Sequence, residues 1–416
     1  MKIFKFGGAS IKDADGVKNM AQVLQKIGFD DILIVISAMG KMTNAFEKLT
    51  DAYFYKKDEL SFLIDEVRAY HYEIATDLFN DKNHEIFKEI EVLLSELTSF
   101  MIHNRSTNYN YVYDQMVSSA ELLSTKIVSF YLNDIGISNS WIDVRESIKT
   151  NSDYRDAKVD WDTTERNIKS TFSPKKLYIT QGFIAADEKG STTTLGREGS
   201  DYSAGIFAYC LDAESLTIWK DVEGVLNADP RYFKETELLK QISYTEAIEL
   251  AFYGASVIHP KTLQPLQKKE IPLFVKSFIK PQNKGTIVGR GIHILPEIPC
   301  FIVKKNQILL SISSIDFSFI VERNISEIFE LLHQHKMKVN LIQNSAISFS
   351  VCMDDSYDNF EELVSKLKNK FNIDFDKEVS LYTIRHFDES AIQKIESDNR
   401  VLLKQMSKET VQIVIQ

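Results

Sequence analysis

Residues 2–40 read KIFKFGGASIKDADGVKNMAQVLQKIGFDDILIVISAMG, and this stretch decides the fold class. It begins with a short apolar strand pattern, continues with a helix-like pattern at residues 13–28, and ends with the apolar run at residues 31–40. Glycines follow directly after both strand patterns. A strand, a helix and a second strand in this order predict the start of an α/β sheet.

Along the rest of the chain, the hydrophobic periodicity and the glycine and proline content change at two places. Residues 41–135 contain no glycine or proline and show helical periodicity, whereas residues 136–300 return to short apolar strands with helices between them. After Pro296 and Pro299 the pattern is strand, helix, strand, strand, helix, which is the order of a small ferredoxin-like module. A weaker repetition of this strand and helix pattern extends to Gln416. We therefore interpret this part of the chain as two tandem units, of which the second is incomplete.

Composition limits the class of protein and its partners. The chain has 416 residues, 44% of them hydrophobic, and a formal net charge of -10. Without a dense basic patch, this balance argues against a nucleic-acid partner. No apolar run reaches the roughly 18 residues that suggest a membrane span. Cys210, Cys300 and Cys352 are too far apart for a metal site or a disulfide framework. These features predict a cytoplasmic protein with no membrane partner.

The turn after the first strand suits an anion. Gly7, Gly8 and Ser10 stand where bare N–H groups can face a phosphate, and Lys5 lies on the strand just before them. The alternative is an ordinary turn with a surface lysine.

The second strand ends in SAMGKMTN, residues 37–44. Ligands of open α/β sheets bind at the carboxyl ends of the strands. Ser37 and Thr43 therefore suit carboxylate recognition, with a plain polar turn as the alternative. Glu121, in the helical part of the chain, is either a site residue or a solvated side chain.

The stretch GSTTTLGREGSD, residues 190–201, gathers hydroxyls, bare amides and one cation. Arg197 can form a two-pronged bond to a carboxylate or phosphate. Asp201 opens the next helix, and the alternative for Ser200 and Asp201 is that they only cap it. Glu198 is unexpected beside a phosphate.

A further strand ends in WKDVEGVLNADPRYF, residues 219–233. Lys220 and Asp221 lie at its carboxyl end, and Arg231 follows in a rigid turn as another cation. An acidic surface loop is the alternative. His259 precedes a proline, and we interpret it as a packed structural residue.

Together these motifs resemble the aspartate kinases of the amino-acid kinase family. The resemblance rests on KFGGAS, SAMGKMTN, ELLST, DVRESIKTN, TQGFIAADEKGSTTTLGREGSDYSA and WKDVEGVLNADPR. It implies a three-layer αβα kinase domain at residues 1–295, with a helical insertion at about 45–135. Residues 300–416 would form tandem ferredoxin-like ACT regulatory domains. The implied reaction is ATP-dependent phosphorylation of L-aspartate to 4-phospho-L-aspartate, with Mg²⁺, at the start of lysine, threonine and methionine synthesis.

The same resemblance implies a role for each candidate residue. Lys5 would stabilise the transferring phosphoryl group, while Gly7, Gly8 and Ser10 would cradle phosphate oxygens. The residues implied to hold aspartate or order its site are Ser37, Thr43, Glu121, Arg197 and Asp201, with Asp201 also counted as catalytic. The residues implied on the nucleotide side are Lys220, Asp221, Arg231 and Ser256, and no side chain is assigned as a metal ligand.

The chain departs from the family pattern at four positions. Ala9 stands where many members have threonine, and Glu198 replaces a common glycine. Leu226 takes a position often held by tyrosine, and Ser256 replaces a lysine that contacts ATP, for which Lys261 can compensate.

Two other functions remain open. One is a sibling kinase for glutamate or acetylglutamate, and the other is an amino-acid sensor without catalysis. For regulation, KVNLIQNSA at residues 338–346 resembles an effector loop in which Asn340 replaces an acid. We therefore expect weak or absent inhibition by lysine and a homodimer formed through residues 300–416.

Overall fold

The computed structural model describes residues 1–255, 258–316, 318–397 and 399–416. These residues form two compact units. Unit 1 comprises Met1–Val225, Leu238–Ile248 and Val257–Ile294, and unit 2 comprises Leu226–Glu237, Glu249–Ser256 and Leu295–Gln416. Along the described residues, no helix has both the length and the apolar character that crossing a membrane requires.

Unit 1 is built on an eight-stranded sheet in the order β3-β5-β2-β1-β8-β10-β11-β9. Neighbouring strands are parallel except for β10 and β11, which pair antiparallel. The strands are β1 (Lys2–Phe6), β2 (Ile32–Ile36), β3 (Ser140–Ile142), β5 (Leu177–Gln181), β8 (Ser215–Lys220), β9 (Gln241–Ser243), β10 (Leu273–Ser277) and β11 (Thr286–Gly289).

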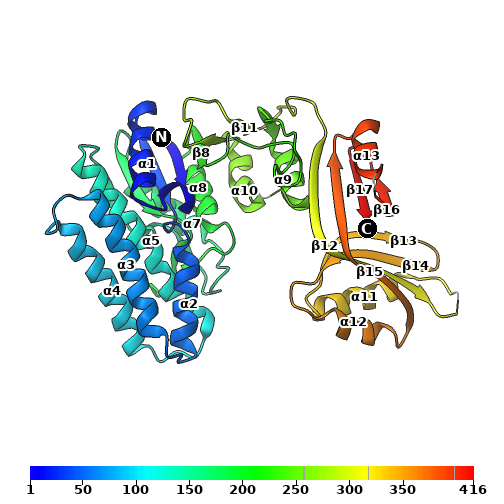
Figure 1. Ribbon diagram of the computed structural model, residues 1–416. Helices are drawn as coiled ribbons and strands as arrows, with labels where there is room; N and C mark the ends of the chain where they lie inside the picture. Colours follow the sequence, from blue (N-terminus) through cyan, green and yellow to red (C-terminus); the bar gives the residue numbers. More distant parts are fainter. Residues whose placement is uncertain (256–257, 317, 398) are drawn as a thin grey trace. The chain divides into compact units, whose positions relative to one another are not determined.

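Helices pack on both faces of this sheet (Figure 1). Side chains alternate along a strand, so Phe4 and Phe6 of β1 face the core with α1 (Ala14–Ile27), while Lys5 points to the opposite face. On that opposite face, α8 (Gly199–Cys210) contacts β1 and packs against α10 (Pro260–Lys269). The predicted α/β fold with helices on both sides of a parallel sheet is confirmed.

The segment without glycine or proline forms a layer of long helices (Figure 1). The longest is α5, whose side chains are mostly buried because it lies between the other helices and the sheet. The helices are α2 (Met42–Phe54), α3 (Leu60–Leu78), α4 (Glu85–His103) and α5 (Tyr109–Asp134).

Shorter elements complete unit 1 around the site. A 3-10 turn η1 (Gly8–Ile11) follows β1, and a small sheet in the order β4-β6-β7 packs near α5. The remaining elements of unit 1 are β4 (Lys149–Thr150), β6 (Ile184–Asp187), β7 (Thr192–Thr194), α6 (Val144–Ser147) and α7 (Trp161–Thr171). Helix α9 (Tyr244–Tyr253) begins in unit 1, and its residues from Glu249 onward belong to unit 2.

Unit 2 contains a six-stranded antiparallel sheet in the order β13-β14-β12-β15-β17-β16. Two long strands run through its middle and are shared by two halves, each with its own apolar core. The elements are β12 (Cys300–Ser314), α11 (Glu322–Gln334), β13 (Lys338–Asn344), β14 (Ser348–Asp354), α12 (Phe360–Leu367), β15 (Phe371–Arg385), α13 (Glu389–Glu396), β16 (Val401–Met406) and β17 (Thr410–Ile415). The first half thus has the full order of a ferredoxin-like module.

Candidate active site

A buried ion pair joins β1 to α8. Lys5 Nζ lies 2.7 Å from Asp201 Oδ1, and both side chains are almost completely shielded from water. The contact is a close charge pair rather than a well-aligned hydrogen bond. Breaking such a pair would leave one charge buried and uncompensated, so each residue holds the other in place.

The capping alternative for Ser200 and Asp201 is wrong. Helix α8 begins at Gly199, with Glu198 at the N-cap position, and no side chain caps it. Glu198 has a φ of 56°, a left-handed conformation that glycine adopts without strain. This backbone conformation favours glycine, so Glu198 is strained at this position.

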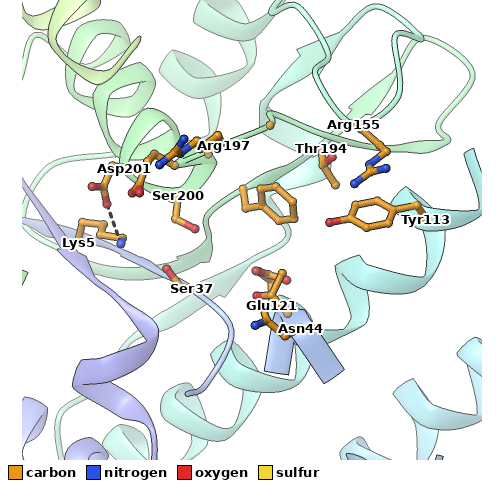
Figure 2. Close-up of a pocket in the computed structure, with 15 residues that line it drawn as sticks. Lys5, Ser37, Asn44, Tyr113, Glu121, Arg155, Thr194, Arg197, Ser200 and Asp201 are labelled. Carbon is orange, nitrogen blue, oxygen red and sulfur yellow. Dashed lines mark ion pairs between the residues drawn. The ribbon is translucent and has the colours of Figure 1, made fainter. Parts of the chain in front are cut away.

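Around the ion pair, unit 1 has a cavity of about 490 Å³ (Figure 2). It brings together the predicted residues Lys5, Ser37, Thr43, Glu121, Arg197 and Asp201. Figure 2 shows Lys5 and Asp201 on one side of this pocket and Tyr113 and Arg155 on the other. Candidates from four separate stretches of sequence therefore converge on one pocket.

Glu121 is the most unusual of these residues. It is fully buried on α5, and the Ala38 N–H donates to its Oε1 at 3.4 Å. Its Oε2 has no hydrogen-bond partner among the described residues. Burial raises the pKa of this carboxyl to about 8. The alternative of a solvated side chain is wrong, and the free oxygen offers a place for a ligand cation.

Asp114, two helical turns before Glu121, fixes the wall of the pocket. It accepts hydrogen bonds from the Thr194 hydroxyl at 2.8 Å, the Thr194 N–H at 2.8 Å and the Arg155 N–H at 3.0 Å. Burial raises the pKa of Asp114 to about 6. This carboxyl thus ties α5 to β7 and to the turn that carries Arg155.

Arg155 is a pocket residue that the sequence did not reveal. Its backbone is left-handed, with a φ of 73°. Its guanidinium lies 4.2 Å from the centre of the Tyr113 ring, and it forms no ion pair within the described part of the chain. No motif marks this residue, because its position depends on the turn conformation. Tyr113 and Phe183 also line the pocket and were not predicted. The other lining residues belong to the predicted stretches 37–44 and 190–201, where they were given no individual role: Asn44, Thr194, Gly196, Glu198, Gly199 and Ser200.

The glycine turn lies beside the pocket without lining it. A side chain at Gly8 would come within 2.7 Å of the carbonyl oxygens of Ala38 and Gly40, so only glycine fits this close approach. A Cβ at Gly7 would lie 3.2 Å from Lys5 Nζ, which places this backbone next to the ammonium. The Ser10 hydroxyl, however, is buried and donates to the Trp219 carbonyl at 3.4 Å.

The predicted nucleotide residues are not among those that line the pocket. Arg231 is mostly exposed and forms a two-pronged bond to Asp229. Lys220 ends β8 and Asp221 follows it. Ser256 lies outside the described residues, and Lys261, which we expected to compensate for it, pairs with Asp156. His259 caps α10 by accepting from the Lys261 N–H, as expected of a structural residue.

Comparisons with known proteins agree with this geometry. The model of the amino acid kinase family matches residues 1–277. The chain is 32% identical to lysine-sensitive aspartokinase 3 of Escherichia coli over 85% of its own length and 78% of that protein. It is 30% identical to chloroplastic aspartokinase 1 of Arabidopsis thaliana, over 85% of this chain and 63% of that protein.

Solved structures give the same result. Escherichia coli aspartokinase III in complex with lysine and aspartate has a TM-score of 0.85 and 28% identity, covering 100% of this chain and 95% of that one. The same enzyme with aspartate and ADP has a TM-score of 0.80 and 27% identity, covering 100% and 96%. The chain belongs to the amino acid kinase family and, within it, to the aspartokinases. It spans only 32% of a bifunctional aspartokinase/homoserine dehydrogenase of Zea mays, with which it shares 31% identity.

Proposed function

We propose that this protein transfers the γ-phosphoryl group of ATP to the side-chain carboxylate of L-aspartate, forming 4-phospho-L-aspartate and ADP. A carboxylate oxygen of aspartate would attack the γ-phosphorus as the bond to the β-phosphate oxygen breaks. The observation that carries this proposal is the charge pattern of the pocket. Asp201 is paired with Lys5, while the buried acid Glu121 keeps one oxygen without a partner among the described residues, and Arg155 and Arg197 line the same pocket. The third acid of the lining, Glu198, is exposed. Aspartate carries one ammonium and two carboxylates, which is the complementary pattern.

The proposed aspartate contacts follow from this match. The free oxygen of Glu121 would accept the ammonium, and Arg197 would hold a carboxylate in a two-pronged bond. Ser37 and Thr43 supply hydroxyl donors from the loop after β2 and the first turn of α2. Arg155 would supply a second guanidinium from the opposite wall.

On the phosphoryl side, positioning and charge neutralisation dominate catalysis. Lys5 would neutralise charge on the transferring group, with Asp201 fixing its ammonium. The backbone N–H groups at Gly7 and Gly8 would meet phosphate oxygens, because the first N–H groups of a helical turn such as η1 have no partner within the turn. We assign Ser10 a supporting place in this turn, and Lys220, Asp221, Arg231 and Ser256 the nucleotide side.

ATP would enter as its Mg²⁺ complex. The described residues contain no cluster of His, Cys, Asp or Glu that could hold a metal. The carboxylate of Asp221, at the carboxyl end of β8, has the oxygen chemistry that Mg²⁺ prefers. When bound, the ion would neutralise phosphate charge.

We also propose a cytoplasmic homodimer formed through residues 300–416, since ferredoxin-like regulatory units commonly pair through their sheets and helices. Light scattering of the full chain tests this assembly. A monomer across the micromolar range would contradict it.

The substrate is tested by coupled ADP release with L-aspartate, L-glutamate and N-acetyl-L-glutamate. Activity with aspartate alone supports the proposal. Faster turnover of glutamate or its acetyl derivative would identify a sibling kinase, and aspartate binding without ADP release would identify a sensor.

A further inference from the structure

A second and larger cleft lies in unit 1, on the sheet face opposite Lys5. Its volume is about 1040 Å³, against about 490 Å³ for the first pocket, and the two share no lining residue. Helix α1 covers the same face over β1, where Phe4 and Phe6 join its core. The cleft continues beyond the end of that helix, at Ile27, across β8, β10 and β11.

The strand register builds the floor of this cleft. Phe4 pairs with Thr217, Thr217 with Phe274, and Phe274 with Ile287, so these side chains form one row across four strands. Phe274 and Ile287 are only half-buried. A row of side chains on a pleated sheet gives a broad, partly apolar surface rather than a narrow hole.

The charge of the cleft is entirely of one sign. Lys2, Lys240, Lys276 and Lys284 line it, and no aspartate or glutamate does. None of these four lysines forms an ion pair in the part of the chain that the structure describes. Asp31 and Glu214, which precede the strands β2 and β8, bind the N-terminal ammonium of Met1 and none of these lysines.

Such a concentration of positive charge is unexpected in a protein with a net charge of -10. Lysines gathered around one cleft repel each other, and the wall of a cleft concentrates their field. Burial also removes water from the Lys276 ammonium and so lowers its pKa. Its ammonium lies 5.4 Å from the centre of the Trp219 ring. A bound anion would offset all of these costs.

We propose that this cleft binds a planar organic anion carrying two or more negative charges. The ring system would lie on the floor formed by Thr217, Phe274 and Ile287, and its acidic groups would meet the lysines. Gln282 and Asn283, which also line the cleft, add amide donors. The site is separate from the kinase pocket, so it does not depend on which acid that pocket phosphorylates. A sheet face made merely soluble by lysines would bind no such ligand.

Pyrenetetrasulfonate is a suitable probe, because it is planar, multiply charged and fluorescent. Its binding is measured on the full chain with excess ADP and L-aspartate present, which keeps it out of the kinase pocket. We expect one saturable site per chain. Inorganic pyrophosphate, which has charge but no ring, should compete weakly; equally strong competition would overturn the planar class of ligand.

A charge-matched pair of variants locates the site. Lys240→Gln with Lys276→Gln should weaken probe binding by roughly tenfold, as expected for losing charged contacts. Lys57→Gln with Lys82→Gln removes the same charge from exposed loops of the helical insertion. This control should change the affinity for the probe less than twofold. Equal loss in both variants, or no saturable binding to the unaltered protein, would overturn the proposal.

Lysine acylation gives a second readout that needs no variant. The probe should protect Lys240 and Lys276 of the unaltered protein from acetic anhydride, as measured by mass spectrometry. Lys57 and Lys82 should stay reactive. Protection of all four lysines alike, or of none, would show that the cleft is not the binding site.

Discussion

Glu121→Gln is expected to strengthen the fold and weaken the substrate site at the same time. Burial raises the pKa of Glu121 from 4.5 to about 8. Because the folded pKa lies above the unfolded one, folding takes up a proton between these values, and this contribution to stability falls as pH rises from 4.5 to about 8. At pH 7 the uptake costs at most about 3 kcal/mol, at 1.36 kcal/mol per pH unit.

The amide substitution removes that cost, and its oxygen can still accept from the Ala38 N–H. Its NH₂ group would replace the free Oε2 and would also lack a partner, and this unsatisfied donor offsets part of the gain in the free energy of unfolding. We therefore expect the free energy of unfolding at pH 7 to rise by about 1–2 kcal/mol in urea titrations. The gain should shrink towards pH 4.5, where the unfolded carboxyl is itself half protonated.

Although the Glu121→Gln protein should be more stable, its affinity for aspartate should be lower. Losing one charged hydrogen bond to the substrate ammonium, worth about 1.5–3 kcal/mol, should raise the KM for aspartate roughly tenfold or more. The KM for ATP should stay near its original value. In the unaltered protein the KM for aspartate should fall as pH rises towards 8, because the ionised fraction of Glu121 grows. The variant should lose this dependence.

Asp134→Asn is the matched control, because it removes a carboxylate from the exposed end of the same helix. It should leave both KM values unchanged. A Glu121→Gln protein with an unchanged KM for aspartate, or with a raised KM for ATP instead, would refute the role given to this residue.

Three other changes probe the remaining parts of the account. Lys5→Ala should lower kcat by about 10²–10³ or more while aspartate binding hardly changes, since it removes one preorganised charge; a variant that keeps over half of the original kcat would contradict this. Arg155→Gly should raise the KM for aspartate several-fold without lowering Tm, because glycine relieves the left-handed backbone that costs about 1–3 kcal/mol; a large drop in Tm with unchanged KM would make Arg155 structural. Half-inhibition by lysine should require millimolar concentrations, because Asn340 is uncharged and its Oδ1 already accepts from Lys304 Nζ at 2.7 Å; inhibition well below millimolar would show a lysine site of another kind.

The sequence predicted the parts of the fold that local pattern determines. The strand and helix patterns of residues 2–40 became β1, α1 and β2, because apolar runs of this length, interrupted by glycines, have few other arrangements. The helical insertion was also visible, because 95 residues without glycine or proline sustain one period. The sequence did not predict that β12 and β15 are shared between the two halves of one sheet, because this arrangement depends on pairing between distant strands.

The site was predicted only where a motif carries the residue. Lys5 and Arg197 belong to recognisable sequence motifs. Arg155 lines the pocket because of a left-handed backbone conformation that no local sequence pattern predicts. Sequence also left open whether Glu121 is solvated, because one acid on a helix has no periodicity of its own. Its burial follows from the packing of α5 against the rest of unit 1.

The most direct test of the proposed reaction is identification of its product. The protein is incubated with Mg²⁺-ATP, L-aspartate and hydroxylamine, which converts an acyl phosphate to a hydroxamate. The account predicts the side-chain hydroxamate of aspartate, identified by mass spectrometry and formed one for one with ADP. ADP formed without this hydroxamate, or a hydroxamate formed only when glutamate replaces aspartate, would contradict it.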